Sequence, residues 1–298
     1  MMINTRLILC TLAAALAANS AMATEGGGSS YPVGAENYTC CAVPPPGMYG
    51  IVWAQHYSAD KAVDNNGDTV TPDDFKVTAN AIVPRFIYVT DKQWHGASVA
   101  LHGILPLVDL DVHVTDGVEQ SKSGLGDATV GLAFGWHHSQ ALHSLFAIDV
   151  IVPTGSYKKD DIANPGRNHW AIQPVLGVSN MNPHGFNYDL KAMWTYNLEN
   201  SATSYQDGQE LIFDYALGWG LGDRWVAGIG GYVYQQVTDD TQDGDTVADN
   251  RGKALAVGPS VRYDSGTGWF ATFKYQQETQ VKNRAEGSTL WIKTVFPF

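Results

Sequence analysis

Strict alternation of apolar and polar residues is the feature of this 298-residue sequence that most limits its fold. It is clearest between Phe186 and Glu199, where seven apolar residues occupy every second position and mostly polar residues lie between them. Successive side chains of a β-strand point to opposite sides of the sheet, so a two-residue period predicts strands with two different faces. The chain is therefore predicted to be all-β.

Segments of this kind recur along the sequence from Gly47 to the end, and each reaches or approaches the ~9–11 residues that a strand needs to cross a membrane. The alternation changes phase at Pro84 and Pro106, where we expect bulges or the ends of the membrane-embedded part. Twelve strands are predicted, at residues 47–59, 73–89, 97–114, 124–137, 142–153, 170–179, 186–200, 209–221, 225–238, 252–264, 268–278 and 287–298.

The connections between these segments alternate in length, which a soluble sandwich has no reason to do. The longer ones are residues 60–72, 115–123, 154–169, 201–208, 239–251 and 279–286. Aromatic residues gather at the strand ends, and the chain finishes on Phe298. Short periplasmic turns, long outer loops and aromatic girdles are typical of bacterial outer-membrane barrels. We therefore expect an antiparallel transmembrane β-barrel of about 12 strands, with a secreted soluble all-β protein as the alternative.

Charge and hydropathy exclude other classes. A net charge of −12 leaves no basic face for nucleic acid, and 44% hydrophobic residues do not fit a disordered chain. Beyond the N-terminus no uncharged apolar run approaches the ~18 residues of a transmembrane helix.

The N-terminus predicts export. Residues 1–23 have the features of a signal peptide: Arg6, an apolar run over residues 7–18, and the small residues Ala21 and Ala23 at a cleavage site. We expect three parts: a cleaved signal peptide at 1–23, a periplasmic segment at 24–46, and the barrel at 47–298. The glycine- and proline-rich segment either inserts as a plug or hangs free as a tail.

Two cysteines remain after cleavage, the adjacent pair Cys40 and Cys41. Neighbouring Cα atoms lie ~3.8 Å apart, below the usual disulfide range, so a bridge between them would be strained. An oxidising compartment still permits that bridge or a bond to another thiol, and two unbridged thiols are the alternative.

Charged residues on the inward phase are candidates for the lumen lining. They are the acids Asp127, Asp149, Asp189 and Asp214 and the bases Lys191, Arg262, Lys274 and Lys293. Four of each sign argue against a ring selective for anions or cations. Many such charges serve only to pair across strands, which is the structural alternative to contact with a solute.

Catalytic and metal chemistry find weak support. Ser156, Asp160, Asp161 and His169 share a loop, and Asp109, Asp111 and His113 alternate on a strand, but abundant Ser, Asp and His make chance clusters common. No catalytic residue, metal ligand or cofactor is predicted. The acidic runs at residues 64–68 and 239–245 lack the twelve-residue calcium loop, and we expect them to meet divalent-bridged lipopolysaccharide.

Several short motifs resemble those of one family. They are Gly124-Leu125-Gly126-Asp127, Val152-Pro153-Thr154-Gly155-Ser156-Tyr157, the run from Asn164 to Trp170 with Pro174, the stretch from Ala23 to Ser29, Pro44-Pro45-Pro46-Gly47-Met48-Tyr49, and Tyr57-Ser58-Ala59-Asp60. Together they resemble the family named for the meta-cleavage pathway of phenol degradation. The resemblance, nearly full length, implies an outer-membrane barrel that takes up small aromatic or otherwise hydrophobic compounds.

The expected function is therefore passive entry of small hydrophobic or aromatic molecules through a porin-like barrel in the bacterial outer membrane, in contact with lipid and lipopolysaccharide. The main alternative is a structural or surface-interaction barrel with a closed lumen. A third reading is a barrel-embedded hydrolase, whose activity would depend on His113 or His169. No nucleic-acid partner is expected, and the sequence does not give the oligomeric state.

Overall fold

The computed structural model describes residues 23–222 and 224–298. Of the predicted signal peptide only Ala23 falls among them. Among these residues no helix is both long and apolar enough to cross a membrane.

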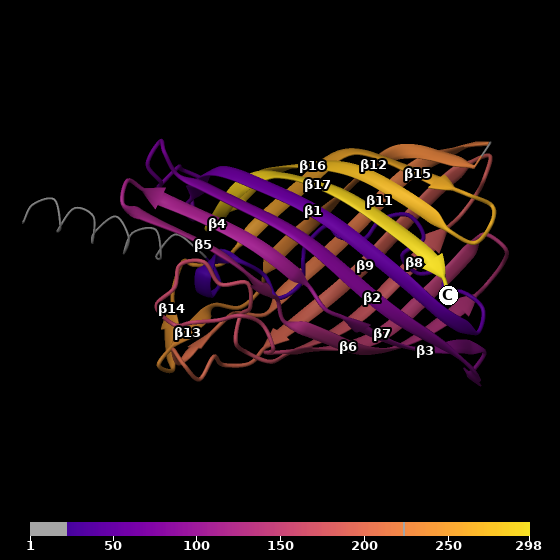
Figure 1. Ribbon diagram of the computed structural model, residues 1–298, viewed down its shortest axis with the longest axis horizontal. Helices are drawn as coiled ribbons and strands as arrows, with labels where there is room; N and C mark the ends of the chain where they lie inside the picture. The colour runs from indigo at the N-terminus through magenta and orange to yellow at the C-terminus, as the bar shows by residue number, and fades with distance from the viewer. Residues whose placement is uncertain (1–22, 223) are drawn as a thin grey trace, which may run out of the picture.

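Twelve antiparallel strands close into a barrel (Figure 1). Around the wall the order is β1-β17-β16-β15-β12-β11-β9-β8-β7-β6-β3-β2, and β2 pairs back with β1. The predicted twelve-stranded antiparallel barrel is confirmed. The wall strands are β1 (Gly47–Val63), β2 (Lys76–Trp94), β3 (Ala97–Ile104), β6 (Ala128–His137), β7 (Leu142–Val152), β8 (Ala171–Asn180), β9 (Phe186–Asn197), β11 (Glu210–Gly222), β12 (Trp225–Gln236), β15 (Lys253–Asp264), β16 (Phe270–Lys282) and β17 (Arg284–Pro297).

A hairpin extends the wall at the end that carries the long loops. It consists of β4 (Leu107–Thr115) and β5 (Val118–Leu125), and β4 pairs with the first half of β2 while β3 pairs with the second half. The predicted strand 97–114 is thus divided at Pro106, which has no N–H for the ladder, and the predicted strand 124–137 is divided between β5 and β6 at Gly126 and Asp127. The predicted loop 115–123 was wrong: strands flank a tight turn at Asp116 and Gly117, whose φ is +80°.

The last hairpin also differs from the prediction. Residues 279–286 were expected to form a loop, but β16 and β17 continue to a turn at Asn283, whose φ is +51°. Larger loops do lie between β7 and β8, between β9 and β11, and between β12 and β15. The last two carry a small three-stranded sheet of β10 (Tyr205–Gln206), β13 (Asp240–Gln242) and β14 (Asp245–Val247).

The two faces of the wall differ as the alternation predicts. In β9, Phe186 and Trp194 are 49% and 51% exposed on the outer surface, whereas Asn187 and Asp189 are each 3% exposed on the inner surface. Lipid would cover the outer apolar face. The inner face is buried because the chain before β1 occupies the lumen, as described next (Figure 1).

Candidate functional site

The N-terminal segment, residues 24–46, passes along the inside of the barrel. At the long-loop end it begins beside β13 and the β16–β17 turn, where a 3-10 turn, η1 (Glu25–Gly27), follows Ala23. At the other end Val43 packs against β6, where a Cβ on Gly135 would lie 2.3 Å from it. The segment adds no strand to the wall, so lumen side chains must satisfy its backbone N–H and C=O groups.

Asp214 of β11 supplies acceptors for this purpose. Its carboxylate receives the backbone N–H groups of Gly34 and Glu36 at 2.8 and 3.0 Å, and the Tyr31 hydroxyl at 2.7 Å. All of these groups are shielded from bulk solvent. A carboxylate that accepts several such bonds holds a chain segment in one register.

Lys274 of β16 supplies donors. Its Nζ donates to the carbonyl oxygens of Ala35 and Glu36, each at 2.9 Å, and to that of Gly34. Three successive carbonyls are therefore gathered by one buried ammonium, opposite the two amides bound by Asp214.

Glu36 is the charged anchor of the segment. Its carboxylate lies 2.7 Å from Lys293 Nζ of β17 and 3.5 Å from Arg85 Nη1 of β2. Both Lys293 and Glu36 are almost completely buried. Lys191 of β9 also contacts the segment: its Nζ lies 4.8 Å from the centre of the Tyr31 ring.

The two cysteines are free thiols with different neighbours. The Cys40 N–H donates to Asp189 at 3.1 Å, while the Cys41 N–H donates to the hydroxyl of Ser179 at 3.0 Å. Space for Cys41 comes from Gly177 of β8, where a Cβ would lie 2.2 Å from the sulfur. The strained vicinal bridge considered from the sequence does not form here.

The remaining candidate lining residues lie apart from this group. Asp149 of β7 binds His102 of β3 at 2.9 Å, and Arg262 of β15 pairs with Asp264 near the short-turn end. Asp127, at the β5–β6 break, accepts the N–H groups of Gly155 and Arg167 at 2.8 and 2.6 Å.

Five of the eight sequence candidates therefore converge on the N-terminal segment: Asp189, Lys191, Asp214, Lys274 and Lys293. Sequence reasoning missed their partner Glu36, and also Arg85 and His102. One feature of the sequence could have indicated a segment inside the lumen: the glycines on the inward phase of β6, β8 and β11, which leave room for its side chains.

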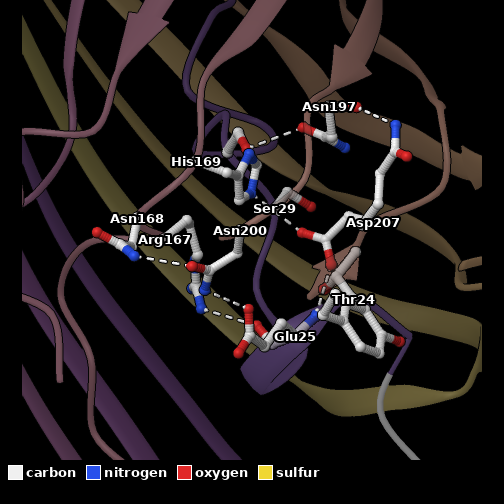
Figure 2. Close-up of polar contacts among 12 residues, drawn as sticks. Thr24, Glu25, Ser29, Arg167, Asn168, His169, Asn197, Asn200 and Asp207 are labelled. Atoms are coloured by element: carbon white, nitrogen blue, oxygen red, sulfur yellow. Dashed lines mark hydrogen bonds and ion pairs between the residues drawn. The ribbon is translucent and has the colours of Figure 1, made fainter. Parts of the chain in front are cut away.

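A polar cluster encloses the outer end of the segment (Figure 2). Glu25 binds Asn200 Nδ2 at 2.7 Å and Tyr157 at 3.0 Å through its carboxylate, and its N–H donates to Asp207 at 2.7 Å. Asp207 also lies 3.2 Å from His169 Nε2. Burial lowers the pKa of His169, but the Asp207 carboxylate outweighs it, so the pKa is raised above its ordinary value.

A cavity of about 610 Å³ lies beside this cluster in the half of the barrel with long loops. One wall is apolar and comes from inward residues of β2 and β4: Val77, Ala79, Ala81, Val83, Val108, Leu110 and Val112. The facing side is polar and includes Ser29, Tyr57, Arg167, Tyr232, Glu278 and Arg284. Deeper in the lumen lies a smaller pocket of about 50 Å³, between Tyr31, Trp53 and Trp291.

The cavity is bounded on one side by a wall that lacks a backbone ladder. β5 pairs with β4 only, and its other edge faces the loop of residues 153–170. Most contacts to that loop come from side chains: Gln120 Oε1 accepts the N–H groups of Ile162 and Ala163 at 2.8 and 3.0 Å, and Lys122 Nζ binds Asp161 at 2.8 Å. One backbone bond, from the Ser156 N–H to the Leu125 carbonyl at 2.7 Å, joins the loop to the end of β5.

The sequence clusters weighed for catalysis or metal binding have other partners. His169 pairs with Asp207, and His113 lies 3.2 Å from Asp74 and 3.1 Å from Glu119. Asp74, His113 and Asp116 have potential ligand atoms within 4.8 Å of one another at the outer end of the hairpin.

Solved structures of outer-membrane proteins resemble this fold. The fold is similar to the crystal structure of an outer membrane channel from Pseudomonas putida F1, with a TM-score of 0.78 and 19% identity over 87% of this chain and 98% of that chain. The translocator domain of autotransporter NalP from Neisseria meningitidis matches at TM-score 0.48 and 12% identity, over 86% and 90% of the two chains. A FadL homologue of Pseudomonas aeruginosa matches at 0.44 and 10%, over 95% and 96%. No curated protein matches the sequence.

At 19% identity the first similarity shows a shared fold. The family is shown by a model described as "Putative MetA-pathway of phenol degradation", which matches residues 59–294. The chain therefore belongs to that family, and its fold is that of an outer-membrane β-barrel.

Proposed function

We propose that this protein is an outer-membrane channel for the passive entry of small hydrophobic or aromatic compounds. The observation that carries the proposal is the cavity of about 610 Å³, with an apolar wall on β2 and β4 and a polar wall opposite. Such a site suits a molecule with an apolar body and a polar group, since apolar lining with a few convergent polar groups is what small-molecule sites usually offer.

In this proposal the N-terminal segment is a plug within the barrel at 47–298, and residues 1–23 are a signal peptide removed on export. The plug separates the cavity from the short-turn end of the lumen. Solute passage therefore requires the segment to shift, and its contacts with Asp214, Lys274 and Lys293 set how readily it does so.

The β5 edge supplies a route into the cavity for solutes dissolved in the membrane. Backbone ladders close the rest of the wall, whereas here the loop of residues 153–170 is held by side chains of Gln120 and Lys122 and by one backbone bond, from the Ser156 N–H to the Leu125 carbonyl at 2.7 Å. Side-chain contacts can open without breaking a strand ladder.

A second candidate function is a structural or surface-interaction barrel with a closed lumen. The observation that favours it is the burial of residues 34–38 of the segment in the lumen, including the Glu36–Lys293 pair. The two functions differ in whether anything passes.

The test is solute entry into liposomes whose outer leaflet contains lipopolysaccharide, with purified protein in the membrane. We expect aromatic compounds to enter faster than sugars of matched size. Leu110→Asn, on the apolar wall, should slow the aromatics without affecting the sugars. Leu107→Asn is the matched control, because Leu107 is 50% exposed on the outside of the same strand. Entry of nothing through the wild-type protein or through a variant lacking residues 24–46 would favour the closed barrel.

A further inference from the structure

Asp240 is a buried carboxylate in the loop between β12 and β15. It accepts hydrogen bonds from the Tyr205 hydroxyl at 2.7 Å, the Gly208 N–H at 2.7 Å, Gln236 Nε2 at 2.6 Å and Asn250 Nδ2 at 2.9 Å. All four donors are uncharged. Within residues 23–222 and 224–298, the ion pairs include none to Asp240. A buried carboxylate without a countercharge carries a large desolvation cost. The site formed by Asp240 and its four donors, here called the socket, is therefore suited to a cation.

The fifth donor is the backbone nitrogen of Thr24, 3.3 Å from Asp240 Oδ2. Thr24 and Asp240 are 1% and 0% exposed. The next nitrogen, that of Glu25, donates to Asp207 at 2.7 Å. The first two nitrogens after the predicted cleavage site therefore face two carboxylates, those of Asp240 and Asp207. Figure 2 shows the second of these contacts, between Glu25 and Asp207.

The backbone at Thr24 is strained in the uncleaved chain. Its φ is +70°, in a region that β-branched residues rarely adopt. The φ torsion is defined by the carbonyl carbon of Ala23, so cutting the Ala23–Thr24 bond abolishes the torsion and its strain.

We propose that signal-peptide removal creates an ammonium at Thr24 that forms an ion pair with Asp240 and anchors the outer end of the plug. The peptidase hydrolyses the Ala23–Thr24 amide with one water: the carbonyl becomes a carboxylate, and the nitrogen becomes an ammonium. That group has three N–H donors where the amide had one, and it supplies the charge that the socket lacks. Maturation thereby locks the segment into the loops. The inference rests on cleavage after Ala23 and does not depend on what the barrel transports.

The first step of the test is the N-terminal residue of the purified mature protein, read by mass spectrometry, which should be Thr24. The second is the rate at which an amine-reactive reagent labels this α-amine near pH 7, with the 80% exposed Lys92 side chain as an internal reference. An ion pair lowers the fraction of reactive neutral amine. We therefore expect Asp240→Asn to speed labelling about tenfold or more.

Asp239→Asn is the matched control, because it removes the same charge from the neighbouring residue, which instead pairs with Arg251 at the surface. It should label like the wild type. Equal rates in wild type and Asp240→Asn would overturn the proposal, as would a mature terminus other than Thr24.

A measurement on the wild-type protein guards against a misfolded variant. The pH dependence of labelling gives the pKa of the α-amine, which should exceed its ordinary value of about 8 if the ion pair forms. A pKa at or below that value would contradict the pairing. The charged and titratable groups around the amine are Asp240, Asp207, Glu25, Tyr205, His169, Arg167 and Arg284.

Discussion

Lys293 Nζ, in the last strand of the barrel, lies 2.7 Å from Glu36 Oε2, in the segment that precedes the first strand. Arg85 of β2 approaches the same carboxylate at 3.5 Å. The two strands that flank β1 therefore hold one buried charge of the plug. Substituting Glu36 is the most direct test of whether these contacts keep the lumen closed.

Glu36→Gln should loosen the plug. The change leaves Lys293 and Arg85 buried without a countercharge, a situation that costs about 3–5 kcal/mol when one member of a buried pair is removed. Single-channel conductance should rise above that of the wild type. Glu286→Gln is the control, because Glu286 pairs with Lys61 at 3.2 Å near the surface. Unchanged conductance in Glu36→Gln would show that this ion pair does not hold the plug.

Gly177→Ala should displace the plug by volume. The new Cβ would lie 2.2 Å from Cys41 Sγ, and overpacking of this kind costs typically about 1–3 kcal/mol. Thiol-reactive probes should then reach Cys41 faster. In a permeation assay, adding Cys41→Ala should recover much of the wild-type behaviour.

Gly103→Ala is the comparison for that experiment, since the nearest atom to its new Cβ would be 4.0 Å away. If both alanine variants changed Cys41 labelling or permeation equally, steric displacement would be the wrong explanation.

Gln120→Leu should weaken the wall beside β5. Two N–H groups of the 153–170 loop, those of Ile162 and Ala163, lose their acceptor, at a cost of about 1–3 kcal/mol if they stay buried. Entry of membrane-dissolved aromatics should increase severalfold, whereas ion conductance should stay the same because the plug is untouched. Gln93→Leu, at the opposite end of the wall, should behave as wild type. A rise in both quantities would point to general damage.

The outer cluster should loosen as the pH rises. The pKa of His169 is raised in the folded protein, so its pairing with Asp207 is fully present below its ordinary value of 6.5 and is lost as the pH passes through the raised value. Protease cleavage within residues 198–209 should accelerate over that interval in wild type and lose this dependence in His169→Gln. His113→Gln, in the distant hairpin, should keep it; an identical pH profile in His169→Gln would exclude this pair as the cause.

The sequence predicts the wall strands well where one face meets lipid and the other meets the lumen, as in β9, because burial then imposes strict alternation. It fails for Val118–Leu125 and for residues 279–286, which extend beyond the apolar band with polar residues on both faces and so look like loops. The plug contacts were not predictable either. Glu36 carries no local pattern, and its partners Lys293 and Arg85 are 257 and 49 positions away, brought together only by closure of the barrel.

The path of the plug has a consequence for assembly. Thr24 lies among the outer loops, yet β1 starts at the opposite end of the barrel and pairs with β17, the final strand. If the barrel closed first, with β1 already paired on both edges, the free N-terminus and the residues of its buried cluster would have to pass through the finished lumen. The simpler order of assembly is that residues 24–46 already lie across the nascent sheet when β17 pairs with β1. The wall would then close around the plug.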